Sequence, residues 1–161
     1  RGVIVSALDP SAPGLPLAGG GGGGGAPSGT FFPEVIALPI VGGDLEPQDG
    51  DPWFDVGAYS LTPSAHEIPG ADTTTVSFTA IGQTTRSGLY GDLRLYDLTH
   101  SAVLAGMSFN GAGWNSGMGV VTMPPGAALL MVQARARAPG GVLVGDFFNL
   151  RGAHLHIVNT F

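Results

Sequence analysis

The sequence contains no cysteine and no lysine, and only 11% of its 161 residues are charged. The missing cysteines exclude a disulfide framework, a thiol nucleophile and any zinc or iron–sulfur site with cysteine ligands. Without lysine, the phosphate-binding loop of nucleotide-hydrolysing enzymes cannot form. The formal net charge of −6 disfavours a nucleic-acid partner. No apolar run reaches about 18 residues, so we expect no helical membrane insertion.

Glycine and proline are abundant, with 28 and 13 residues, and they concentrate near the N-terminus. Residues 19–25 are seven consecutive glycines with prolines on both sides. We therefore predict a glycine- and proline-rich N-terminal arm and linker over residues 1–33, followed by one domain over residues 34–161. The arm either docks on a neighbouring subunit, with residues 3–5 as a short strand, or is a disordered tail. Because the first residue is Arg1, the chain is either processed or part of a longer product.

Alternation of apolar and polar residues predicts strands in the rest of the chain. Residues 73–81 place Val76, Phe78 and Ala80 on one face and hydroxyl side chains on the other. Residues 89–109 predict a hairpin with a turn at 99–101. Its first strand groups Leu89, Leu93 and Leu95 opposite Tyr90, Asp92, Arg94 and Tyr96, and its second groups Val103, Ala105, Met107 and Phe109.

Residues 127–138 are rich in good helix formers, yet alternation favours a strand. It separates Leu130, Val132, Ala134 and Ala136 from Gln133, Arg135 and Arg137. Further strands are expected over 35–41, 56–61, 117–123, 142–148 and 153–158. Eight or nine short strands with glycine and proline between them predict an all-β fold, an antiparallel β-sandwich or jelly roll.

Two groups of side chains contain metal-ligand types, although we expect no metal and no other cofactor. His154 and His156 share one face of an expected strand, in a pattern similar to the His-x-His strand of cupins. A metal there would need further ligands such as His66, His100 or Asp146, because no Glu or His follows His156. The alternative is that both histidines face solvent or a neighbouring subunit.

The second group is acidic and lies in the loop over residues 44–55. Its carboxylates could hold calcium, but their spacing differs from that of an EF-hand, and acidic surface loops are common without a metal. They belong to Asp44, Glu46, Asp49, Asp51 and Asp55.

Aromatic residues in polar loops are the candidate ligand-binding residues. Trp53 follows the acidic loop, and Trp114 and Asn115 lie in a glycine-rich loop. Such residues could bind a carbohydrate, or they could close one end of the core or pack on a neighbouring subunit. No nucleophile elbow or ordered Ser–His–acid set is present, and nothing singles out a pair of carboxylates. We therefore predict no catalytic residues and no enzyme activity.

The segments GLYGDLRLYDLTHSAVLAG and LLMVQARARAPGGVLVGDFFNLRGAHLHIV resemble the small β-sandwich modules of bacteriophage virion proteins, which occur in capsid decoration, head-fibre and tail-fibre proteins. The resemblance covers residues 73–158. It implies a structural virion protein, or one of a similar surface assembly, that binds copies of itself, often as a trimer, and other assembly proteins. The alternative is a carbohydrate- or receptor-binding module on a fibre or a bacterial cell surface, with a host glycan as partner.

Overall fold

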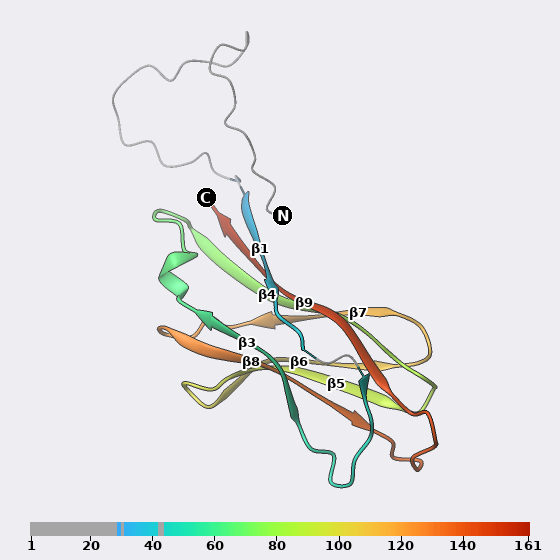
Figure 1. Cartoon of the computed structure of the whole chain (residues 1–161). Coiled ribbons are helices and arrows are strands. Elements are labelled where there is room, and N and C mark those ends of the chain that lie inside the picture. The colour runs from blue at the N-terminus through green and yellow to red at the C-terminus, as the bar shows by residue number, and fades with distance from the viewer. Residues whose placement is uncertain (1–28, 30, 42–43) are drawn as a thin grey trace, which may run out of the picture.

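The computed structural model describes residues 29, 31–41 and 44–161. They form two packed layers of antiparallel strands (Figure 1). The strands are β1 (Phe31–Leu38), β2 (Asp44–Leu45), β3 (Phe54–Leu61), β4 (Thr73–Thr84), β5 (Tyr90–Asp97), β6 (Ala102–Asn110), β7 (Asn115–Val121), β8 (Ala128–Arg137) and β9 (Phe148–Thr160). Helical structure in the described part is one 3₁₀ turn, η1 (Pro63–Ala65), and no helix there could cross a membrane. The glycine run expected to act as an arm lies outside the described residues.

The strand order identifies the sandwich as a jelly roll. One sheet has the order β1-β9-β4-β7, with β2 pairing the start of β9, and the other has the order β3-β8-β5-β6. The pairs β1·β9, β3·β8, β4·β7 and β5·β6 are all antiparallel and nested in the sequence. Leaving the short β2 aside, two sheets of four strands joined in this way form the double-sheet jelly roll. The predicted fold class is confirmed.

The core lies between the sheets and is built from the alternating positions that the sequence indicated. Val76, Phe78 and Ala80 of β4 are buried, and Phe78 pairs in register with the equally buried Leu155 of β9. From β8, Leu130, Val132, Ala134 and Ala136 enter the same core. Burying each large apolar side chain stabilises the fold by about 1.5–3 kcal/mol. The strand prediction for residues 127–138 and the predicted hairpin, now β5 and β6, are confirmed.

Val103 is one correction to the predicted pattern. The sequence grouped it with Ala105 on the core face, but Val103 is 55% exposed and faces outward. Leu95 pairs with Ala105 and the next residue, Tyr96, pairs with Val103, so Leu104 is an extra residue in a β-bulge. A bulge reverses the side-chain alternation beyond it, which turns Val103 to the other face.

The strand expected over residues 142–148 is the second correction. Its aliphatic residues favour a strand, but residues 138–147 form turns and loop, and β9 begins only at Phe148. Gly141 and Gly145 have φ of 98° and 86°, in the left-handed region that breaks a strand. Residues 153–158 then belong to the single long strand β9. The other expected strands correspond to β1, β3 and β7, with β1 starting at Phe31, ahead of the expected domain boundary.

A phenylalanine ring fixes the end of the sandwich where β5 begins. Phe148 is fully buried and stacks on Phe109, with 5.6 Å between ring centroids. Gly91 and Gly82 leave the space that the ring fills: a Cβ on Gly82 would lie 2.8 Å from it, and one on Gly91 would overlap it. Gly91 lies between Tyr90 and Asp92, two outward residues of β5. The ring therefore also positions the outer surface of this strand.

Candidate binding surfaces

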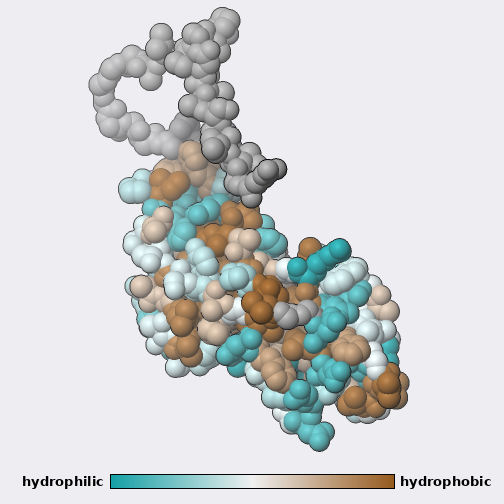
Figure 2. All heavy atoms as spheres, viewed as in Figure 1, coloured by the Kyte–Doolittle hydropathy of each residue, from teal (hydrophilic) through white to brown (hydrophobic). Residues whose placement is uncertain are grey.

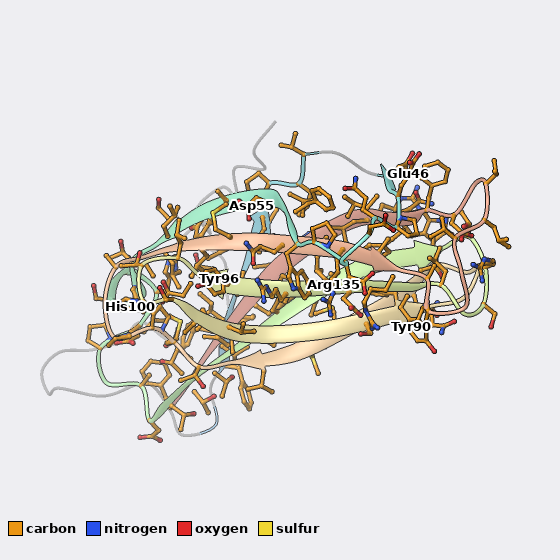
Figure 3. All side chains as sticks on the ribbon, turned by 90° about the horizontal axis from the view of Figure 1, so that it is seen from below. Glu46, Asp55, Tyr90, Tyr96, His100 and Arg135 are labelled. Atoms are coloured by element: carbon orange, nitrogen blue, oxygen red, sulfur yellow. The ribbon has the colours of Figure 1, made fainter. Side chains whose placement is uncertain are left out.

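Three of the six arginines in the sequence lie together on the outer face of the β3-β8-β5-β6 sheet. Arg94 is on β5, and Arg135 and Arg137 are on the neighbouring strand β8, where alternation turns them away from the buried alanines between them. With Trp53, Asp92 and Ser108 they line a groove of about 460 Å³, which we call the arginine groove. Tyr96, Arg135 and Tyr90 follow one another along this face in Figure 3.

One row of hydrogen bonds crosses the arginine groove and is centred on Asp92. This carboxylate is buried and accepts hydrogen bonds from Arg135 Nε at 2.9 Å, from Ser108 Oγ at 2.6 Å and from Arg137. Burial alone would raise the pKa of Asp92, but the hydrogen bonds from Arg137, Ser108 and Arg135 outweigh it and hold the pKa below its usual range. Asp92 therefore stays ionised and fixes the position of both guanidinium groups.

A second, parallel row positions Arg94. Its Nε donates to Gln133 Oε1 at 2.7 Å, and Gln133 Nε2 in turn donates to Asp55 Oδ1 at 2.7 Å. Asp55 lies on β3 at the edge of the sheet, so the row extends over three strands. Each outward side chain in the row is thereby fixed by its neighbour.

Trp53 brings an aromatic surface to this cationic face. It precedes β3, and its ring lies 4.2 Å from the Arg94 guanidinium carbon and 4.4 Å from that of Arg135. Such cation–π contacts hold an indole ring against guanidinium groups. Tyr96 and Tyr90 contribute two more rings beside Arg94 and Arg137. The face thus combines hydrogen-bond donors with flat apolar surfaces.

Sequence reasoning identified Trp53 as a candidate but missed its partners. The alternation had placed Arg94, Arg135 and Asp92 on outward faces without bringing them together. The available signal was that half of the arginines of a lysine-free chain occupy outward positions of two expected strands. Only the pairing of β5 with β8 and the position of Trp53 beside β8 turn that signal into one site.

The other predicted ligand-binding residues lie elsewhere. Trp114 is 45% exposed, just before β7, with the guanidinium group of Arg151 over its ring at 5.1 Å. Asn115 donates a hydrogen bond to the carbonyl of Gly113. Since Arg151 belongs to β9, this pair lies by the other sheet, and the two tryptophans do not share a site.

The histidines named as metal-ligand types are dispersed. His154 and His156 are neighbours on the outer face of β9, with 6.2 Å between ring centroids, and His156 Nε2 contacts Thr79 Oγ1 at 2.9 Å. His66 pairs with Glu34, His100 with Asp97 and Asp146 with Arg86. In the described part of the chain, no three histidine or acidic side chains are close enough to hold a metal ion.

The acidic loop is also spread out. Asp44 pairs with β9 through the short strand β2, Asp55 joins the second row of the arginine groove, and Asp51 has a φ of 48° in the loop before β3. Glu46 lies by the connection between β8 and β9, and Asp49 is exposed in a turn. These five side chains do not form one site.

A second surface lies on the connection between β8 and β9. Val142 and Leu143 are each 60% exposed and Val144 is fully exposed; we call these three residues the apolar tip. In Figure 2 an apolar patch lies at the lower right of the molecule, where Figure 1 places this connection. Exposed contiguous apolar residues in a protein surface are typical of an interaction site.

Hydrogen bonds to Arg86 and Asp146 hold the apolar tip in place. Arg86 donates to both carboxylate oxygens of Asp146, at 2.7 and 2.8 Å, and to the carbonyl of Gly141. The Asp146 carboxylate also accepts from the backbone N–H of Leu143. The hydrogen bond from Arg86 lowers the pKa of Asp146, with a further contribution from the Leu143 amide. The tip is therefore a fixed structure presented to solvent.

The edge strands of the β1-β9-β4-β7 sheet carry further exposed apolar residues. Val35 of β1 and Met118 and Val120 of β7 are all more than half exposed. Edge strands are usually protected from association by charged side chains, above all lysine, which this chain lacks.

No protein family and no curated protein matches the sequence. Among solved structures, infectious bursal disease virus of the Gx strain aligns with a TM-score of 0.53 and 11% identity over 83% of this chain and 33% of that chain. The VP2 subviral particle of that virus gives 0.51 and 11% over the same shares. The chain thus spans about a third of these viral proteins. A CBM36-1 domain of a xylanase from the hindgut metagenome of Trinervitermes trinervoides gives 0.43 and 11%, over 78% of this chain and 96% of that chain.

At this level of identity the alignments establish the fold. The sequence predicted a resemblance to bacteriophage virion modules. The β-sandwich architecture is confirmed, and the viral proteins that share it here are those of infectious bursal disease virus. The chain is a β-sandwich with jelly-roll strand order.

Proposed function

We propose that this chain is a non-enzymatic structural module of a viral particle, or of a similar surface assembly, and that it binds neighbouring subunits through the apolar tip. It acts there as a decoration or fibre module. The neighbours are copies of the same chain and other proteins of the assembly. Its location is the particle surface.

The observation that carries this proposal is the apolar tip, whose three side chains are more than half exposed while hydrogen bonds hold its backbone. Three consecutive aliphatic side chains are exposed. Arg86 and Asp146 hold the loop through its backbone, so the shape of the loop does not require these side chains to be apolar. Full burial of an aliphatic side chain contributes about 1.5–3 kcal/mol, so covering the tip would favour association by several kcal/mol. Because the tip is already ordered, little conformational entropy is lost on binding.

Two other observations support the same proposal. The exposed apolar residues on β1 and β7, without lysine to protect the edges, suit a surface that neighbouring subunits cover. The viral particle proteins that share the fold add support from architecture.

Light scattering after gel filtration of the full chain at micromolar concentration tests the proposal. We expect a mass that is a multiple of 16.2 kDa, and we expect Leu143→Asp to reduce it toward a single chain. Leu143 holds the loop only through backbone groups, so the substitution leaves the hydrogen bonds of the loop intact.

The matched control is Leu98→Asp. Leu98 is 51% exposed in the turn between β5 and β6. This turn lies at the end of the β3-β8-β5-β6 sheet opposite to the apolar tip, because Asp97 pairs with the start of β8 and the tip follows its end. It should leave the mass unchanged. A monomeric chain that also binds no protein of its assembly would refute the proposal, and so would equal effects of the two substitutions.

Carbohydrate binding is the second candidate function, and the place of Trp53 supports it. The indole ring lines the arginine groove among donors that could bind sugar oxygens. Pockets that bind small ligands combine flat apolar surfaces with a few fixed polar groups in this way. A glycan array probed with the full chain and with Trp53→Ala tests it: we expect binding that the substitution abolishes, and an array without binding would reject it.

A further inference from the structure

We infer that the arginine groove binds a carboxylate-bearing sugar, a hexuronate or a sialic acid. The inference rests on carbohydrate binding as the second candidate function, and it names the site and the ligand class. It depends on the guanidinium N–H groups of the groove that form no hydrogen bond within the described residues, on the space above Gly106, and on the indole of Trp53.

The groove contains hydrogen-bond donors without a partner among the described residues, whereas its acceptors already accept hydrogen bonds from groove side chains. Both carboxylate oxygens of Asp92 accept hydrogen bonds, and Oε1 of Gln133 accepts from Arg94. Within the described residues, Arg94 and Arg135 donate only through Nε, which leaves their terminal NH₂ groups for a ligand. A ligand that fits must therefore supply acceptors, and a planar carboxylate matches the guanidinium fork best.

The neighbouring cations favour an anionic acceptor over a neutral one. Arg137 pairs with the Asp92 carboxylate and lies near Asp51, so its charge is largely neutralised. Arg94, in contrast, is connected to Asp55 only through Gln133. The guanidinium groups of Arg94 and Arg135 both lie close to the Trp53 ring, at 4.2 and 4.4 Å from its centroid. Within the described residues, Arg94 forms no ion pair, and Arg135 shares the Asp92 carboxylate with Arg137. The two guanidinium groups beside Trp53 therefore form a local positive site in an acidic chain.

The shape suits a sugar ring. The groove holds about 460 Å³, a volume in the range of small-ligand pockets. Gly106 of β6 leaves it open, since a Cβ there would contact only the carbonyl of Leu93, at 3.7 Å. Trp53 lines the groove with Arg94 and Arg135 against its ring, and it adds apolar surface that the C–H groups of a pyranose can contact while the sugar carboxylate reaches the arginines.

Peptides and nucleic acids fit this groove less well. The arginines come from β8 and β5, which are paired on both sides. The groove lies on the face of the sheet, so a peptide added to the free edge of β6 would lie beside the groove and not in it. The net charge of −6 repels an extended phosphate backbone. A short acidic sugar presents one to three charges to the groove and keeps the rest of its surface neutral.

Isothermal titration calorimetry of the full chain at physiological salt tests the inference. The probes are trigalacturonic acid and 3′-sialyllactose, with lactose as the neutral comparison. We expect at least one acidic sugar to bind ten-fold or more tightly than lactose, and the two acidic probes distinguish a uronate from a sialic acid. Arg94→Gln, which removes the guanidinium group together with its hydrogen bond to Gln133 and its contacts with the Trp53 and Tyr96 rings, should weaken that binding at least ten-fold.

Two further variants separate the groove from charge in general. Gly106→Val fills the groove without changing any charge, and its Cβ is accommodated, so it should abolish binding in a folded chain. Arg151→Gln is the matched control, because it removes one arginine that lies beside a tryptophan outside the groove. It should leave the affinity within two-fold of the original, and thermal melting confirms that each variant folds.

Three outcomes would overturn the inference. Equal binding of lactose and the acidic sugars would refute the anionic ligand and leave carbohydrate binding standing. Loss of binding in Arg151→Gln but not in Arg94→Gln would place the site at Trp114. No binding of any of the three sugars would reject the inference, and the glycan array would then decide separately on carbohydrate binding.

Discussion

Replacing Gly91 with alanine tests how the core positions the arginine groove. A Cβ on Gly91 would stand closer than 2.5 Å to three atoms of the Phe148 ring. Ordinary contacts begin near 3.4 Å, so the ring would have to move by about 1 Å or more. Phe148 is fully buried between Gly82 and Phe109 and has no free space to move into.

We expect Gly91→Ala to lower the free energy of unfolding by about 2–4 kcal/mol, because overpacking costs about 1–3 kcal/mol and partial expulsion of Phe148 adds to it. In urea, with a slope of about 2 kcal/mol per molar, the midpoint should fall by roughly 1–2 M. Because Gly91 adjoins Asp92, binding in the groove should weaken as well.

Two other glycines serve as graded controls for this measurement. A Cβ on Gly117 would meet mainly the flexible Met107 side chain, with 2.7 Å to its sulfur, so Gly117→Ala should cost less. Gly106→Ala should cost nothing, and can gain about 0.5 kcal/mol because alanine is less flexible in the unfolded chain. If Gly91→Ala unfolds within about 0.5 kcal/mol of Gly106→Ala, the packing described for Phe148 is wrong.

Three further predictions concern the charged groups. The pKa values of Asp92, Asp97 and Asp146 are all lowered in the folded chain, so their ionised forms stabilise it at neutral pH. The urea midpoint should stay level down to about pH 5 and decrease below about pH 4. A urea midpoint that rises below about pH 4 would contradict this prediction. Asp92→Ala leaves Arg135 and Arg137 without their shared acceptor and should cost about 1–3 kcal/mol, measured by urea unfolding; no change would show that the row carries no stability. Arg86→Gln removes the ion pair with Asp146 and should speed proteolysis of the apolar tip with little change in the global midpoint; unchanged proteolysis would mean the tip is held by other contacts.

The sequence predicted the sandwich well because strand alternation is a local property. Val76, Phe78 and Ala80 on β4, and the division of β8 into alanines and arginines, could be assigned without knowing any strand partner. Where a local irregularity intervened, the prediction was wrong. The bulge at Leu104 turned Val103 outward, and the Asp146 turn replaced a strand in the aliphatic run 142–148.

The binding surfaces were harder to predict because they depend on contacts between distant residues. Trp53 lies next to Arg94, 41 positions away in the sequence, only because β3 and β5 both pair with β8, and no local pattern records that strand order. The apolar tip likewise depends on Arg86, which approaches Asp146 from a loop at the end of β4. The sequence pattern of its three aliphatic residues favours a strand, and the ion pair between Arg86 and Asp146 accounts for their exposure.

The central claim, that neighbouring subunits cover the apolar tip, is tested most directly by hydrogen exchange of the full chain in dilute and concentrated solution. The tip lies on the surface of the single chain, so a neighbouring subunit that covers it should slow the exchange of its amides, which become more protected as the chains associate. We predict that the strongest gain in protection falls on residues 142–146, and that Leu143→Asp removes it. Association that protects other segments and leaves residues 142–146 unchanged would contradict the claim.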